Sequence, residues 1–381
     1  QEKAGPEAVK IRALDRYTFQ VELKKPVPYL ENILPHFAFS VVPLHVIEKF
    51  GRGWTRPENF VGNGPFLLET WKPHEEMRCI PNPKYWDKKQ VKLGRIIFLP
   101  VDDEAIGYNM YLNEECDWGC AVPPTMIQSA KGRKDFIIAP YIGTYYYVFQ
   151  TRKPPLNDPR VRKALSISFS RDELLETVES TGQSAYGLVP PMPGYSGINS
   201  NKEEIAAAKD LLSEAGFPNG RGFPRLTILY NSSPYHRKIA EYIRRQWLEN
   251  LGVRVETASQ EWGTYLKSLK EGDYDIARTG WIGTYQDPGP FLEVFITGNL
   301  ALNCGYSNHV FDDLMEKAAT ASYGKERFDV LRKVEELLIN GDQVVMPIFT
   351  YVSHNMIDLD TWGGWYPNVM NYHPVKYIYS K

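Results

Sequence analysis

The 381-residue sequence has no run of about 20 apolar residues, the length that a membrane-spanning helix requires. Its longest apolar runs, at 37–42 and 344–349, are interrupted by Ser40 and Pro347 and have the length of buried strands. Neither sign of charge predominates, because 44 Lys and Arg residues are balanced by 46 Asp and Glu residues, which gives a formal net charge of −2. A chain this close to neutral has no field that would attract nucleic acid, so we expect no nucleic-acid partner.

Cysteine is scarce, and the four residues predict no metal site. Cys116 and Cys120 flank three residues, and an extended chain would separate them by about 13 Å. A disulfide tolerates Cα atoms only ~4.4–6.8 Å apart, so this pair could bond only across a turn. Cys79 and Cys304 are isolated. We favour four thiols that pack as small apolar groups, because no CxxC or HxxxH spacing accompanies them. The redox compartment stays undecided.

Most catalytic signatures are missing as well. The sequence contains no GxGxxG, Walker A or GxSxG motif, and His74 has no second histidine at metalloprotease spacing. Neighbouring carboxylates at 102–104 and 114–115 could in principle serve glycoside hydrolysis. Adjacent residues of a strand point to opposite faces, so a solvated loop or helix end is the favoured interpretation. We therefore expect no enzyme, no catalytic residues and no cofactor, with a carbohydrate-active hydrolase as the remote alternative.

What is present is a mixture of strand and helix patterns, which predicts an α/β protein of two or three lobes at this length. Helix boundaries carry the clearest signals: Asp158 precedes Pro159, Ser170 opens a capping box with Glu173, and Gly252 follows an amphipathic run. The expected strands are 9–13, 17–23, 66–71, 76–80, 96–101, 136–139, 144–150, 226–230 and 344–351. The expected helices are 43–50, 103–112, one from 159, one after 170, 201–215, 235–251, 310–319 and 326–339.

Aromatic residues are plentiful, with 24 Tyr, 17 Phe and 9 Trp. Core packing explains most of them. Trp262 and Trp281, however, stand among Gly, Pro and Asp, where a purely structural indole is less expected. Indoles beside a pocket offer a large, flat contact area with little conformational freedom to lose, which suits a receptor for variable ligands.

Four segments resemble a known family. GNGPFLLETWK at 62–72, NPKYW at 82–86, KPPLNDPRVRKAL at 153–165 and the stretch 275–288 occur in the family's order with compatible spacing. Together they resemble the extracytoplasmic solute-binding proteins of family 5, and in particular the oligopeptide-binding branch that serves peptide ABC importers. The similarity extends from Val9 to the C-terminus.

The resemblance implies a periplasmic-binding-protein-like fold of class II, an α/β two-lobed clamp with an extra domain. Residues 1–40 would be the tail of the extra domain, 41–142 with 352–381 lobe I, and 143–351 the ligand-binding lobe II. The implied function is capture of oligopeptides by closure and delivery to an ABC permease, in the periplasm or at the outer face of the cytoplasmic membrane, lipid-anchored or soluble. The family's N-terminal portion has no counterpart here, so we expect a truncated or nicked chain, with the missing fragment as a further candidate partner.

Carried over residue by residue, the resemblance identifies a ligand-binding set. Its members are Tyr141, His236, Trp262, Arg278, Gly280, Trp281, Ile282, Thr284 and Asp287. The family's aspartate for the peptide α-ammonium falls at Thr284, whose hydroxyl cannot supply the charge, and a buried ammonium without a counter-ion costs several kcal/mol. Asp287 is the candidate replacement. The alternative within the same scaffold is a non-peptide or amine-blocked ligand.

Overall fold

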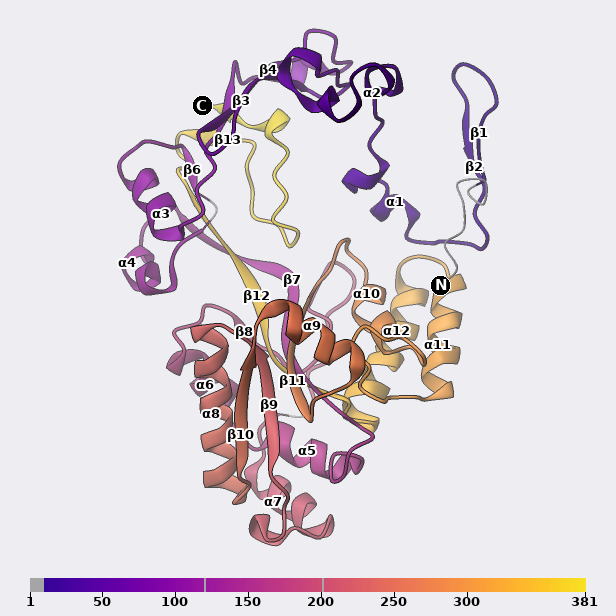
Figure 1. The fold of residues 1–381 in the computed structure, drawn as a ribbon, viewed down its shortest axis with the longest axis vertical. Helices are drawn as coiled ribbons and strands as arrows, with labels where there is room; N and C mark the ends of the chain where they lie inside the picture. The colour runs from indigo at the N-terminus through magenta and orange to yellow at the C-terminus, as the bar shows by residue number, and fades with distance from the viewer. Residues whose placement is uncertain (1–9, 120, 201) are drawn as a thin grey trace.

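The computed structural model describes residues 10–119, 121–200 and 202–381. Two lobes lie one above the other in Figure 1. We call the part built on the large sheet the lower lobe, and the part that carries α2–α4 and β3–β5 the upper lobe. Val9 of the first expected strand and Cys120 lie outside the described residues, whereas Cys79, Cys116 and Cys304 are free thiols, of which only Cys304 is fully buried.

A mixed seven-stranded sheet organises the lower lobe, with strand order β10–β9–β11–β7–β12–β6 and β8 beside β12. β9 runs parallel to β10 and β11, whereas β7 is antiparallel to both β11 and β12. Its strands are β6 (Trp118–Gly119), β7 (Phe136–Phe149), β8 (Gln183–Ser184), β9 (Leu226–Asn231), β10 (Val255–Gln260), β11 (Ile276–Ile282) and β12 (Val345–Ile357).

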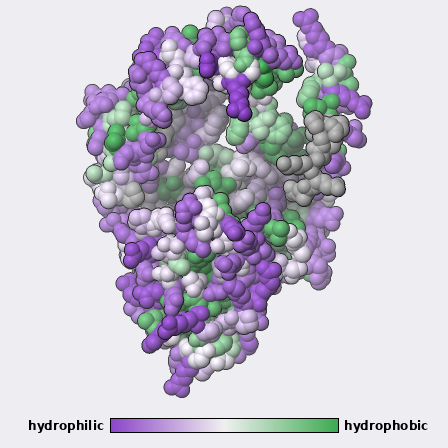
Figure 2. Space-filling view, in the orientation of Figure 1, coloured by the Kyte–Doolittle hydropathy of each residue, from purple (hydrophilic) through white to green (hydrophobic). Residues whose placement is uncertain are grey.

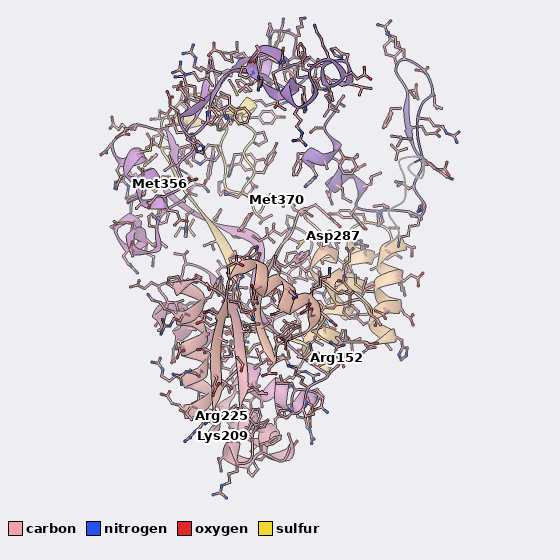
Figure 3. The ribbon with its side chains drawn as sticks, in the orientation of Figure 1. Arg152, Lys209, Arg225, Asp287, Met356 and Met370 are labelled. Atoms are coloured by element: carbon pink, nitrogen blue, oxygen red, sulfur yellow. The ribbon has the colours of Figure 1, made fainter. Side chains whose placement is uncertain are left out.

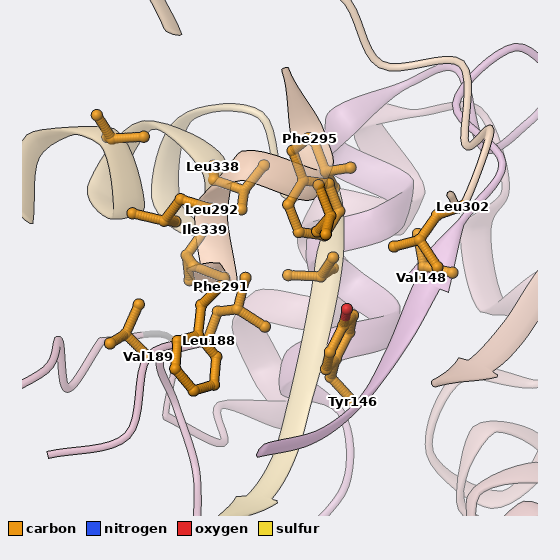
Figure 4. Packing of buried hydrophobic residues seen from close by; sticks show 14 of the residues in the cluster. Tyr146, Val148, Leu188, Val189, Phe291, Leu292, Phe295, Leu302, Leu338 and Ile339 are labelled. Carbon is orange, nitrogen blue, oxygen red and sulfur yellow. The ribbon is translucent and has the colours of Figure 1, made fainter. Parts of the chain in front are cut away.

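Helices cover both faces of this sheet. They are α5 (Pro159–Ile167), α6 (Arg171–Thr177), α7 (Ile205–Glu214), α8 (Pro234–Leu251), α9 (Trp262–Glu271), α10 (Gly289–Leu292), α11 (His309–Thr320) and α12 (Lys325–Glu336), which continues as a π-helical turn, η9 (Leu337–Gly341). The sheet separates two hydrophobic cores, and successive side chains of β7 point to opposite faces. Tyr145, Tyr147 and Phe149 therefore pack in one core, and Tyr146 and Val148 pack in the other. Figure 4 shows the second of these cores, around Tyr146.

The helix boundaries follow the capping signals of the sequence. The Asp158 side chain accepts a hydrogen bond of 2.8 Å from the Arg160 amide, and the Ser170 hydroxyl accepts one of 3.2 Å from the Glu173 amide. Gly252 ends α8 in the left-handed conformation, with φ of 69°. The three predicted helix boundaries are confirmed, although only the serine half of the capping box at Ser170 forms.

Two strands join the lobes, and here the sequence prediction is wrong. The two strands expected at 136–139 and 144–150 are one 14-residue strand, β7. Pro140 and Gly143 interrupt the strand pattern locally, but Pro140 pairs with Val352 of β12 and Gly143 pairs with Ile282 of β11, so the strand continues through both positions. β12 likewise extends past the expected end at 351 to Ile357. β7 and β12 cross together between the lobes in Figure 1, and their register shifts between Pro347 and Phe349 and between Thr350 and Val352.

The upper lobe contains smaller elements. They are β1 (Ile11–Ala13) and β2 (Phe19–Val21), α1 (Leu30–Ile33), α2 (Leu44–Phe50), β3 (Phe66–Lys72), β4 (Glu76–Pro81), β5 (Ile96–Phe98), α3 (Glu104–Leu112), α4 (Ile127–Ala130), β13 (Trp362–Gly363) and β14 (Tyr379–Ser380). β3, β4 and β5 form an antiparallel sheet, and β1 with β2 forms a separate hairpin whose residues are all exposed. Asp103 caps α3, so the carboxylates at 102–104 stand at a helix end, as expected. None of the described helices combines the length and apolarity needed to cross a bilayer.

Candidate functional site

Topology brings most of the predicted binding residues to one edge of the large sheet. Because β9, β10 and β11 are parallel, their carboxyl ends share that edge, together with the first turns of the helices that follow them. His236 lies in the first turn of α8, Trp262 begins α9, and β11 ends with the segment from Arg278 to Ile282. In Figure 2 the molecular surface is hollowed between the two lobes above this edge. The edge therefore faces a cleft.

Arg278 is the central polar group of the site. Its guanidinium donates hydrogen bonds to Asn231 Oδ1 at 3.2 Å and to the Tyr351 hydroxyl at 3.3 Å, and it lies 4.7 Å from the centroid of the Tyr145 ring. Within the described residues it forms no ion pair with a carboxylate, and its buried Nε has no hydrogen-bond acceptor. The cleft thus holds a cation that its described surroundings do not neutralise.

His236 lies beside this cation and is neutral. Its Nδ1 is 3.3 Å from the Tyr145 hydroxyl, and the two rings pack with centroids 5.6 Å apart. Burial, with a smaller contribution from the Arg278 charge, lowers the pKa of His236 to about 3. At neutral pH the imidazole therefore offers a hydrogen bond to a ligand without adding a second positive charge.

Gly280 gives the edge of β11 room for a neighbouring side chain. A Cβ atom at this position would lie 2.5 Å from the Tyr351 hydroxyl, and one at Gly143 would lie 2.6 Å from Tyr351 Cδ2. Tyr351 falls at the irregularity in the pairing of β12 with β7, so its ring lies across both glycines and reaches Arg278. The predicted binding set lacks Tyr351, Tyr145 and Asn231, because the two tyrosines lie inside expected apolar strands and Asn231 falls just beyond the strand expected at 226–230.

The two indoles and Ile282 occupy different surroundings. Trp262 is the first residue of α9; it is 53% exposed and stacks on Tyr265 with ring centroids 6.2 Å apart. Trp281 packs against the lower-lobe core, and within the described residues its buried Nε1 has no hydrogen-bond acceptor. Ile282 is 48% exposed at the end of β11, and Tyr141 is half-buried on β7, two residues before Gly143, the partner of Ile282. Because successive side chains of a strand point to opposite faces of the sheet, Arg278 and Gly280 lie on one face and Trp281 lies on the other.

Thr284 and Asp287 differ in their access to the cleft. Thr284 is exposed, whereas Asp287 is completely buried. Asp287 accepts two hydrogen bonds of 2.9 Å from Arg327, and its Oδ1 accepts a third of 2.7 Å from the Gly289 amide. Figure 3 shows Asp287 at the top of the lower lobe, below α1. Both carboxylate oxygens of Asp287 are thus already engaged within the lower lobe, which disfavours the hypothesis that Asp287 replaces the ammonium-binding aspartate.

A cleft between two lobes joined by paired strands, with one edge lined by an arginine and indoles, defines a solute-binding protein of the two-lobed clamp type. The family model for bacterial extracellular solute-binding proteins, family 5, matches residues 2–301. The chain belongs to this family. The periplasmic oligopeptide-binding protein OppA of Salmonella typhimurium is 32% identical over 382 residues, which cover 97% of this chain and 69% of that protein.

Solved structures of related proteins confirm the α/β clamp fold. A structure described as the unliganded open form of the periplasmic murein tripeptide-binding protein MppA is 32% identical, with a TM-score of 0.87 over 99% of this chain and 75% of that one. A second structure of the Escherichia coli MppA is 31% identical, with a TM-score of 0.77 over 99% of this chain and 76% of that one. The fold of this chain therefore matches the structure described as unliganded and open with a higher TM-score than it matches the second MppA structure.

Proposed function

We propose that this chain captures oligopeptides in the cleft and delivers them to an ABC permease outside the cytoplasm, without cleaving them. The observation that carries the proposal is Arg278, a largely buried cation that forms no ion pair with a described carboxylate. A cation in such a site is stabilised by a ligand anion, and a peptide brings one at its C-terminus. Similarity to a periplasmic oligopeptide-binding protein supports the same ligand class.

Peptide backbone would pair with the free edge at the end of β11. Ile282 pairs with Gly143 of β7 on one side, while β9 pairs with β11 only at Ile276 and Ala277. The other side of the segment from Gly280 to Ile282 is thus open to a further strand, which is the geometry of β-augmentation. His236, Trp262, Trp281 and Tyr141 would then contact the ligand's side chains and carbonyl groups.

The peptide would be captured when the two lobes close around it. We place the lobe boundaries near residues 142/143 and 351/352, with 41–142 and 352–381 as lobe I, 143–351 as lobe II and 1–40 as the tail of the extra domain. Both boundaries fall inside the paired strands β7 and β12, and the second falls at the register shift between Thr350 and Val352. A ligand that contacts both lobes favours the closed state by its differential affinity. A location in the periplasm or at the outer face of the cytoplasmic membrane, lipid-anchored or soluble, suits this role.

The upper lobe has a surface that suits an N-terminal partner segment. Several of its large apolar side chains are exposed, namely Phe19, Phe37, Phe39, Val41, Val42, Ile97 and Phe98. Exposed apolar surface can mark an interaction site in soluble proteins. The relative from Salmonella is longer than this chain, which spans 69% of it. We propose that polypeptide corresponding to the rest of such a relative, in the same chain or as a separate fragment, covers this surface.

Isothermal titration calorimetry with tri-alanine and with N-acetyl-tri-alanine tests the peptide ligand. We expect both to bind with dissociation constants within about three-fold of each other, because exposed Thr284 carries no charge and Asp287 is already paired. Thr284→Asp should tighten binding of the free amine about ten-fold and leave the acetylated peptide unchanged. If neither peptide binds and native mass spectrometry of the purified protein reveals a non-peptide ligand, the proposed function is wrong.

A further inference from the structure

The loop that follows β11, residues 283–288, is held from outside by the N-terminal part of the chain. Tyr29, the residue before α1, stacks on Tyr285 with ring centroids 5.3 Å apart and planes 10° apart. The guanidinium of Arg327 lies 4.6 Å from the centroid of the same Tyr29 ring. One tyrosine from the N-terminal segment therefore contacts both the loop and a helix of the lower lobe.

Arg327 extends this contact into the middle of the loop. Its Nε donates to Asp287 Oδ2 and its second terminal nitrogen to Oδ1, each at 2.9 Å. Both residues are almost fully buried, and Asp287 in turn accepts a hydrogen bond from the Gly289 amide where α10 begins. The Tyr29 ring thus lies against the group that fixes the carboxyl-terminal end of the loop.

A second contact, made by hydrogen bonds, also joins the N-terminal segment to this loop. Asn32 of α1 donates a hydrogen bond of 2.7 Å to the Tyr323 hydroxyl, which donates one of 3.1 Å to the carbonyl oxygen of Gln286. In Figure 1, α1 lies above α10 and α12, on the far side of the cleft from the crossing of β7 and β12. The N-terminal segment therefore contacts the lower lobe independently of the two strands that join the lobes.

The loop has little internal support of its own. Its backbone hydrogen bonds include one from the Gly283 amide to the Ile142 carbonyl at 2.8 Å and one from the Asp287 amide to the Tyr285 carbonyl at 2.9 Å. It begins directly after Ile282, the last residue of the edge that the proposed function assigns to the peptide. We propose that Tyr29 is a positioning residue for ligand recognition: it holds this loop, and through it the end of β11, in the geometry that receives the peptide. This inference rests on the proposed function.

Hydrogen exchange and calorimetry on the full chain test it together. In Tyr29→Ala we expect faster amide exchange across 283–289 in the ligand-free protein, and a dissociation constant for tri-alanine about three- to ten-fold higher, since stacked aromatic and cation–π contacts are lost. Tyr29→Phe keeps the stacked ring and should match the unmodified protein in both measurements. Tyr17→Ala is the matched control, because Tyr17 lies in the same N-terminal part and is 88% exposed.

Each outcome decides the inference. Unchanged exchange in Tyr29→Ala, or faster exchange with unchanged affinity, overturns it. If Tyr29→Ala unfolds, Asn32→Ala replaces it, and the same two changes are required of that variant. If the unmodified chain binds no peptide, the proposed function fails, while the exchange comparison still decides whether Tyr29 orders the loop.

Discussion

Arg278→Gln should remove the preference for a free C-terminal carboxylate. The unmodified protein is expected to bind tri-alanine about a hundred-fold more tightly than tri-alanine amide, because truncating one partner of a desolvated charge pair costs about 2–5 kcal/mol. In the variant the two ligands should bind within about three-fold of each other. The reason is local: Arg278 lies between Tyr145, Asn231 and Tyr351, and its described surroundings supply no carboxylate to neutralise it.

Calorimetry with both ligands and both proteins forms a double-mutant cycle, which isolates the arginine–carboxylate coupling from general loosening of the cleft. Arg225→Gln is the control, because Arg225 is exposed and lies at the far end of the lower lobe in Figure 3, paired with Glu256 at 3.1 Å. If Arg278→Gln weakens the acid and the amide equally, Arg278 does not bind the carboxylate.

Arg327→Met should destabilise the fold by about 3–5 kcal/mol. The substitution leaves the Asp287 carboxylate buried without its cation, and Asp287 is 0% exposed while Arg327 is 2% exposed. The variant also deletes the hydrogen bond that Arg327 donates to the Ala318 carbonyl. The urea midpoint of the lower lobe, followed by tryptophan fluorescence, should fall accordingly.

Two further variants make this result specific to the buried pair. Lys325→Met removes an ion pair with Asp329 on the same helix, but Lys325 is 88% exposed, so the midpoint should barely change. Combining Arg327→Met with Asp287→Leu should restore much of the stability, since an apolar pair can replace a buried ionic one. Equal midpoints for Arg327→Met and Lys325→Met would show that the buried pair contributes no more than the exposed one.

The parts of the fold that the sequence predicted are those with local causes. The helix boundaries at Asp158, Ser170 and Gly252 could be predicted because their capping hydrogen bonds join residues only a few positions apart in the sequence. The start of α7 was predicted too early, at 201 rather than Ile205, since N-terminal helix boundaries without a capping bond have no sharp signal. β10 and α9 were not predicted, because their patterns are short and polar.

The site itself depends on contacts between residues far apart in sequence. The resemblance supplied the nine binding residues, but local pattern could not reveal that Asp287 pairs with Arg327, 40 residues away. Nor could it reveal that Tyr351 lies over Gly280 or that Tyr29 stacks on Tyr285. The order of parallel strands decides which of these groups meet, and that order becomes visible only in the folded chain.

Small-angle X-ray scattering with and without saturating tri-alanine tests the closing of the two lobes most directly. The structure resembles the open form of a related protein, with β7 and β12 as the strands that cross between the lobes. A ligand that contacts both lobes should therefore lower the radius of gyration and narrow the distance distribution. Scattering curves that superimpose, while calorimetry on the same sample shows the peptide bound, would contradict capture by closure.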